Sequence, residues 1–196
     1  FTAAATSEID SRGHTLSLLL ALPREGPAAL GVHHDVFTSE AALVAERRIE
    51  AMLTHLQRQG LIYEGVLPPP KGKPSADWQP RPQLLFRSTA FGDDVDRPLQ
   101  RAGGQWTYMA ADLAYHLDKI QRGAEELIDV WGADHGGYIK RMQAGVHALS
   151  GGRVALDVKI CQLVNLMERG QPLKMSKRAG RTINLRAVID EVGKDV

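Results

Sequence analysis

The sequence contains very little cysteine. Cys161 is the single one in 196 residues, so no disulfide can form within the chain, and the reducing cytoplasm is the location we expect. The sequence also has no apolar run near the length of about 20 residues that a membrane-spanning helix needs. Residues 16–22 are apolar, but the stretch is short and no basic segment precedes it. We therefore expect neither a signal peptide nor a membrane partner.

A strong charge of one sign is absent as well. The chain has 24 Lys and Arg against 23 Asp and Glu, and its formal net charge of +1 is too small to indicate a nucleic-acid partner by itself. It contains no GxGxxG run, no Walker A motif and no internal repeat. Hydrophobic residues make up 43% of the chain, which is typical of a globular protein, and the length allows one good core with a small second unit.

The second half of the chain shows a strand–helix–strand pattern. Residues 127–131 predict a buried strand that ends at Gly132, helical spacing over 139–149 predicts a helix, and alternation over 154–160 predicts another strand. A further helix precedes them, with its apolar face between residues 109 and 120. This order predicts an α/β fold with a parallel sheet, whose ligands bind beyond the carboxyl ends of the strands.

The first half is less regular. Thr38 or Ser39 can cap a helix, and apolar residues at helical spacing then predict one continuous helix that Gly60 ends. Residues 61–90 predict an irregular, β-rich insert that contains a strand at 83–87. We expect the chain to have three parts: an unassigned segment over 1–29, a helix plus β-rich insert over 30–102, and an α/β part over 103–196.

A short basic run near the C-terminal end has the groups that phosphate binding needs. It consists of Lys174, Met175, Ser176, Lys177 and Arg178, and Gly180 follows shortly after. Ammonium groups on a loop that bends can follow negative charge as it builds on the leaving oxygens of a phosphate. By composition alone, a solvated basic turn is the more common explanation of such a run.

Two pairs of residues are candidates for substrate contacts. Tyr108 and Asp112 are four positions apart on one predicted helix, so they share a face, and the carboxylate suits a guanidinium cation. The alternative is that Asp112 is an ordinary surface residue. Gly132 and Asp134 follow a predicted strand, with His135 next to them, and Asp134 can accept hydrogen bonds from both hydroxyls of a ribose. The alternative is a plain turn in which Asp134 caps the next helix.

Two clusters of possible metal ligands do not predict a metal site. The acidic residues of 93–96 lack the glycine and the distal glutamate of a calcium loop, so we expect a solvated turn. His33, His34 and Asp35 have no further ligands at a sensible spacing, and we expect them to be structural or surface residues.

Several stretches together resemble one family. The run 174–178 is similar to the KMSKS signature of class I aminoacyl-tRNA synthetases, in its KMSKR form, and the whole set resembles arginyl-tRNA synthetases of the bacterial type. The stretches are Leu30-Gly31-Val32, Asp35-Val36-Phe37, Ser39-Glu40, Phe91-Gly92-Asp93-Asp94, Asp96-Arg97, Tyr108, Asp112-Leu113-Ala114-Tyr115-His116, Gly132-Ala133-Asp134-His135, Tyr138, 174–180 and 190–195. The resemblance covers about residues 30–196.

The resemblance implies a fold and an activity. Residues 103–196 would form the second half of a Rossmann-like catalytic domain with parallel strands, and residues 30–102 would supply a helix and a mixed α/β insert. The family activates arginine with ATP and Mg²⁺, and then esterifies the arginine to the 3′-terminal adenosine of tRNA(Arg). Arginine, ATP and tRNA(Arg) are therefore the partners that the resemblance implies.

The resemblance also implies roles for single residues. Tyr108 and Asp112 would recognise the guanidinium of the substrate, and His135 would lie near the bound amino acid. Gly132 and Asp134 would contact the ATP ribose. The loop over the ATP phosphates would contain Lys174, Met175, Ser176 and Lys177. Lys177 would be the main stabiliser of the departing pyrophosphate, and no side chain would bind a metal directly.

One motif of the family is missing. No His-x-Gly-His motif is present, because His14, His33 and His34 near the start of the chain have other neighbours. We therefore expect the chain to be a part of an arginine–tRNA ligase that is inactive alone. Two alternatives stay open: a truncated, non-catalytic paralogue that binds arginine, nucleotide or a partner, and a class I synthetase specific for lysine or glutamate.

Overall fold

The computed structural model of the protein describes residues 26–68, 80–101, 103–162, 164, 167–168, 170–172 and 185–193. The chain divides into two compact units, a larger one over Thr38–Val164 and a smaller one that combines the two ends of the chain. The larger unit contains every candidate side chain that the structure describes apart from His33, His34 and Asp35.

The larger unit begins with helices α2 (Glu40–Ala45) and α3 (Arg48–Arg58), where we expected one continuous helix. The Oγ of Ser39 caps α2 by accepting a hydrogen bond from the Ala42 N–H. That expectation is wrong because the chain breaks at Arg47, which takes a left-handed conformation with φ 56°. On a continuous helix, Leu43 and Ile49 would point about 120° apart, so the break lets both side chains be buried.

The β-rich insert forms an antiparallel sheet. Strand β1 (Ile62–Gly65) pairs with β2 (Gln83–Phe86), and β2 pairs with β3 (Arg97–Gln100). The strand expected at 83–87 is therefore confirmed, whereas β3 was not predicted. Its inward side chain, Leu99, is fully buried and joins the core that the helices form.

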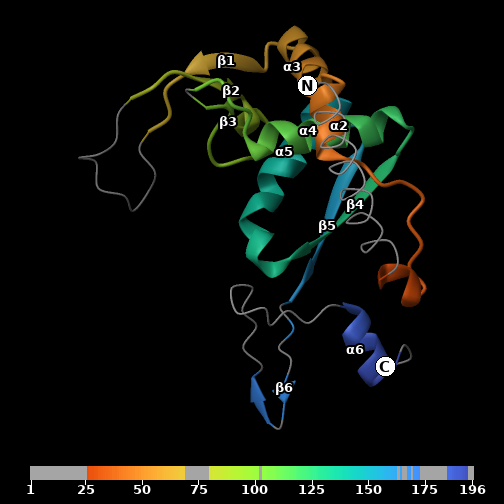
Figure 1. Ribbon diagram of the computed structural model, residues 1–196. Helices are drawn as coiled ribbons and strands as arrows, with labels where there is room; N and C mark the ends of the chain where they lie inside the picture. Colours follow the sequence, from red (N-terminus) through yellow and green to blue (C-terminus); the bar gives the residue numbers. More distant parts are fainter. Residues whose placement is uncertain are drawn as a thin grey trace, which may run out of the picture. The chain divides into compact units, whose positions relative to one another are not determined.

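A parallel βαβ unit follows, as the sequence predicted. Helix α4 (Tyr108–Gln121) leads into strand β4 (Glu126–Gly132), and the 3-10 helix η3 (Ala133–Tyr138) leads into helix α5 (Ile139–Ser150) and strand β5 (Ala155–Cys161). Strands β4 and β5 pair in parallel from Glu126–Ala155 to Gly132–Cys161 and lie side by side in Figure 1. The α/β fold with parallel strands is confirmed.

The hydrophobic core lies where α3, α4 and α5 meet. Apolar residues from these helices are buried together with others from β2 to β5: Ile49, Met52, Leu56, Phe86, Leu99, Leu113, Leu127, Met142, Val146 and Leu156. Helices α4 and α5 approach so closely at Gly145 that a Cβ at that position would collide with the side chain of Leu113. The packing fixes the orientation of α4, which carries the candidate residues Tyr108 and Asp112.

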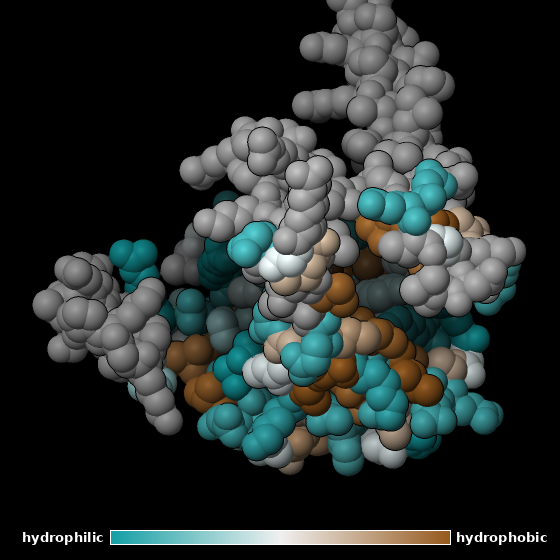
Figure 2. All heavy atoms as spheres, turned by 90° about the horizontal axis from the view of Figure 1, so that it is seen from below, coloured by the Kyte–Doolittle hydropathy of each residue, from teal (hydrophilic) through white to brown (hydrophobic). Residues whose placement is uncertain are grey.

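Part of the apolar surface of the larger unit stays uncovered. Ile128 and Val130 on β4 are 59% and 65% exposed, although parallel sheets usually have both faces covered. The space-filling view in Figure 2 shows a brown, apolar area within a surface of mostly teal, hydrophilic residues.

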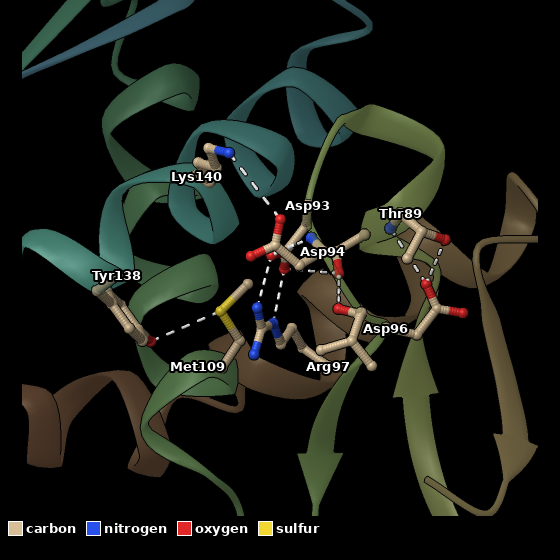
Figure 3. A network of polar contacts seen from close by, with 10 residues as sticks. Thr89, Asp93, Asp94, Asp96, Arg97, Met109, Tyr138 and Lys140 are labelled. Atoms are coloured by element: carbon tan, nitrogen blue, oxygen red, sulfur yellow. Dashed lines mark hydrogen bonds and ion pairs between the residues drawn. The ribbon is translucent and has the colours of Figure 1, made fainter. Parts of the chain in front are cut away.

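The acidic residues of 93–96 are not a simple solvated turn, which corrects our expectation (Figure 3). The carboxylate of Asp93 is buried and accepts hydrogen bonds from Nε and Nη2 of Arg97 at 2.7 and 2.6 Å, and from Ser88 Oγ at 2.9 Å. Asp96 accepts from the Tyr63 hydroxyl at 2.7 Å and from the Thr89 hydroxyl and N–H. Donors of the chain itself therefore satisfy both carboxylates.

The smaller unit contributes strands β6 (Met167–Glu168) and β7 (Gln171–Pro172), which pair antiparallel, and helix α6 (Leu185–Val192). His33, His34 and Asp35 are exposed, and the described residues contain no group of side chains that could hold a metal ion. Within the same residues, no helix has both the length and the apolar character that crossing a membrane requires.

Candidate functional site

Helix α4 places Tyr108 and Asp112 at the surface of the larger unit. Thr107 caps the helix: its Oγ1 accepts from the Ala110 N–H and donates to the Pro98 carbonyl at 2.8 Å, which ties the helix start to β3. Tyr108, in the first turn, is 77% exposed, and Asp112, one turn later, is half-buried. The prediction that the two residues share a helix face agrees with this arrangement.

A small cavity lies against this face of α4. Its volume is about 180 Å³, and the residues that line it come from the start of α2 and from α4: Thr38, Glu40, Leu43, Tyr108, Ala111, Asp112 and Tyr115. A second cavity, of about 210 Å³, shares Glu40, Tyr108 and Ala111 with the first and adds Arg101 and Trp106 to its lining. The structure therefore brings both predicted residues, Tyr108 and Asp112, to one cavity.

The first cavity has the electrostatic character of a cation site. Two carboxylates, Glu40 and Asp112, line it together with two phenols, and no lysine or arginine does. Within the part of the chain that the structure describes, neither carboxylate has a cationic partner. The family resemblance includes Glu40 only as part of the Ser39-Glu40 stretch and assigns it no role. Nothing in the sequence near Glu40 shows that α4, which comes much later in the chain, packs across from it.

Tyr138 orients the carboxylate of Asp112. The Tyr138 hydroxyl donates a hydrogen bond of 2.9 Å to Oδ2 of Asp112, so Asp112 is not an ordinary surface residue. Burial and the nearby charge of Asp112 raise the pKa of Tyr138 well above its usual value, and the hydroxyl keeps its proton. Sequence reasoning missed this contact, because Tyr138 comes from η3 and not from the same helix.

A buried charge network lies one turn further along α4. His116 Nδ1 is 2.7 Å from the backbone carbonyl of Asp112, and its Nε2 is 2.9 Å from Oδ2 of Asp129 on β4. Lys119 Nζ donates to the other oxygen of Asp129, also at 2.9 Å. Burial alone would raise the pKa of Asp129, but the hydrogen bonds from His116 and Lys119 outweigh it and lower that pKa to about 2. The network attaches α4 to β4 one turn after Asp112.

The predicted nucleotide contacts follow β4, where Gly132 ends the strand and Asp134 and His135 are exposed on η3. Asp134 Oδ2 lies 3.6 Å from His135 Nε2, and the carboxylate makes no capping hydrogen bond to α5. A Cβ on Gly132 would approach Oδ1 of Asp134 to 2.7 Å, so a larger residue there would force Asp134 to move. His135 does not line the cavity of Tyr108 and Asp112. The roles of these three residues stay predictions.

The basic run of 174–178 lies outside the described residues. The predicted roles of Lys174, Met175, Ser176 and Lys177 on the ATP phosphates are therefore neither supported nor opposed by the structure. Of the predicted site, the structure describes Tyr108, Asp112, Gly132, Asp134 and His135.

Comparison with known proteins gives a consistent result. No family model matches the chain. An arginine–tRNA ligase from Cereibacter sphaeroides is 58% identical over 187 residues, which are 95% of this chain and 32% of that protein. An arginine–tRNA ligase from Paracoccus denitrificans is 62% identical over 173 residues, which are 88% of this chain and 30% of that protein. The resemblance to arginyl-tRNA synthetases is confirmed.

A solved structure agrees with these relatives. A crystal structure of a protein from Campylobacter jejuni, described as an arginyl-tRNA synthetase, aligns with 91% of this chain at a TM-score of 0.71 and 32% identity. The alignment covers 35% of that protein. The chain thus spans about a third of the length of the synthetases that it matches.

Proposed function

We propose that this chain supplies the arginine-recognition side of an arginine–tRNA ligase, which activates arginine with ATP and transfers it to tRNA(Arg). The observation that carries the proposal is the cavity in which Glu40 and Asp112 present carboxylates without a cationic partner among the described residues. The similarity to arginine–tRNA ligases over most of the chain supports it.

The chemistry of the cavity favours a guanidinium over other side chains. A guanidinium is a planar cation with five N–H donors, and it can bond to more than one carboxylate at once. Glutamate would bring a third negative charge beside Glu40 and Asp112, which is unfavourable. Lysine is a point charge with three donors and cannot form the paired bonds that a guanidinium makes with a carboxylate. Tyr108 adds a phenol to the wall of the cavity.

The nucleotide side of the proposal rests on the family resemblance. Gly132 and Asp134 would contact the ATP ribose, and His135 would lie near the amino acid. The loop of Lys174, Met175, Ser176 and Lys177 would cover the phosphates. In the proposal, Mg²⁺ arrives bound to ATP. A cytoplasmic location belongs to the same proposal.

In the proposed reaction, the carboxylate of arginine attacks the α-phosphorus of ATP and pyrophosphate departs. Glu40 and Asp112 bind and orient the far end of the amino acid, and Lys177 stabilises the charge that develops on the pyrophosphate. The adenylate then passes its aminoacyl group to a hydroxyl of the terminal adenosine of tRNA(Arg), and AMP leaves.

A chimeric ligase tests the proposal. In this protein, the chain replaces the 187 matching residues of the Cereibacter sphaeroides relative. We expect arginine-dependent pyrophosphate–ATP exchange and charging of tRNA(Arg), with little exchange for lysine or glutamate. The unaltered relative is the control. A chimera that melts cooperatively but activates no amino acid would favour the non-catalytic paralogue, and a chimera that prefers lysine or glutamate would favour a synthetase of another specificity.

A further inference from the structure

Tyr138 contacts the side chain of Asp112 without lining the cavity itself. Its hydroxyl lies 2.9 Å from Oδ2 of Asp112, yet Tyr138 itself does not line either cavity. Among the described residues, the other oxygen of Asp112, Oδ1, accepts no hydrogen bond. Within these residues, the carboxylate is therefore held at one oxygen, and the other has no hydrogen-bond donor.

The ring of Tyr138 is fixed on several sides. It packs against Trp131 with the ring centroids 5.9 Å apart, and the guanidinium of Arg141 lies 4.9 Å from its centre. The hydroxyl is also 3.6 Å from the sulfur of Met109, a contact drawn in Figure 3. A carboxylate accepts a hydrogen bond much better than a thioether sulfur does, so the proton of the hydroxyl belongs to Asp112.

We propose that Tyr138 is a positioning residue for arginine recognition, which holds the carboxylate of Asp112 in the orientation that meets a guanidinium. The proposal rests on the proposed function and extends it by one residue. Tyr138 acts only through Asp112, because it does not reach the cavity. Tyr138 holds the Asp112 side chain in one orientation before the substrate binds. Without this contact, arginine would have to order the side chain on binding, at a cost in conformational entropy.

The test is Tyr138→Phe in the chimeric ligase, measured by arginine-dependent pyrophosphate–ATP exchange. The change removes one hydroxyl and keeps the ring against Trp131, so we expect the variant to fold. We expect the KM for arginine to rise roughly 10- to 100-fold, the scale of a hydrogen bond to a charged group, with kcat nearly unchanged. The guanidinium lies far from the reacting carboxylate, so its contacts are lost equally in the ground state and the transition state.

Tyr63→Phe is the matched control. The Tyr63 hydroxyl also donates to a carboxylate, Asp96 Oδ2 at 2.7 Å, but neither residue lines the cavities. A merely structural defect lowers the amount of active enzyme and therefore kcat, without changing KM. We expect Tyr63→Phe to behave in that way. As a second measurement, saturating arginine should raise the melting temperature of Tyr63→Phe as in the parent chimera, and raise that of Tyr138→Phe less.

A double-mutant cycle shows whether Tyr138 acts through Asp112. In an Asp112→Ala background, Tyr138→Phe should change kcat/KM for arginine less than about twofold, because the group that it positions is gone. If the two changes act independently, their effects on kcat/KM multiply, and this result would overturn the positioning role. An unchanged KM for arginine in Tyr138→Phe would overturn it as well. If instead Asp112→Ala itself leaves KM for arginine unchanged, the proposed arginine site fails, and that result is distinguishable from a failure of Tyr138 alone.

Discussion

Acidic side chains occupy two regions of the larger unit, and their hydrogen bonding differs. Near β3, Asp93 and Asp96 are saturated by donors of the chain, among them Arg97, Ser88 and Tyr63. At the cavity between α2 and α4, Asp112 receives one hydrogen bond from the described residues, from Tyr138. A carboxylate that is fully satisfied holds the fold, whereas one with an oxygen free toward a cavity can bind a cation.

The comparison predicts its largest effect for Asp112→Asn. In the chimeric ligase, the change should lower kcat/KM for arginine by about 3–5 kcal/mol, the scale of breaking a buried ion pair. Citrulline has a neutral ureido group in place of the guanidinium and should lose much less, because an asparagine amide can still bond to it. The measurement is the ratio of kcat/KM for the two substrates in the parent chimera and in the variant. An unchanged ratio would show that Asp112 does not recognise the guanidinium.

Asp93→Asn should show the opposite behaviour. Burial alone would raise the pKa of Asp93, but hydrogen bonds from Arg97, the Asp94 N–H and Ser88 hold it below its usual range. The variant leaves Arg97 without its carboxylate, so we expect about 3 kcal/mol less stability and an unchanged KM for arginine. Asp94→Asn, at an exposed neighbour, is the control and should cost less than about 0.5 kcal/mol in chemical denaturation.

Asp129→Asn should lower the stability of the folded protein by an amount that depends on pH. The pKa of Asp129 is about 2 in the folded protein, below its ordinary value of 3.8, so its contribution to stability is complete above about pH 4. The contribution is lost as the pH falls from about 4 to 2. We expect a loss of about 2 kcal/mol at pH 6 that shrinks toward pH 2. Denaturation of both proteins across this range measures it, and a constant difference would argue against the pairing.

Glu40→Gln should weaken arginine binding less than Asp112→Asn does. Glu40 is exposed at the start of α2, where water screens its charge, so we expect the KM for arginine to rise about tenfold. Glu46→Gln lies just after α2 and does not line the cavity, which makes it a suitable control. Equal KM values in the two variants would remove Glu40 from the site.

Local patterns predicted the elements whose residues follow one another in the chain. The periodicity of α4 and the alternation of β5 gave both elements, and the i, i+4 spacing placed Tyr108 and Asp112 on one face. Contacts between distant segments were not predictable in this way. Neither the approach of Glu40 to α4 nor the bond from Tyr138 leaves a local signal. The break at Arg47 was missed because it depends on which face of each helix the core buries.

The central claim is that arginine binds with its guanidinium in the cavity of Glu40 and Asp112. A crystal structure of the chimeric ligase with bound arginine tests it most directly. We predict the guanidinium within hydrogen-bonding distance of Oδ1 of Asp112 and of the Glu40 carboxylate, with the Tyr138 hydroxyl still on Oδ2. Arginine bound elsewhere, with the two carboxylates facing only water, would contradict the account.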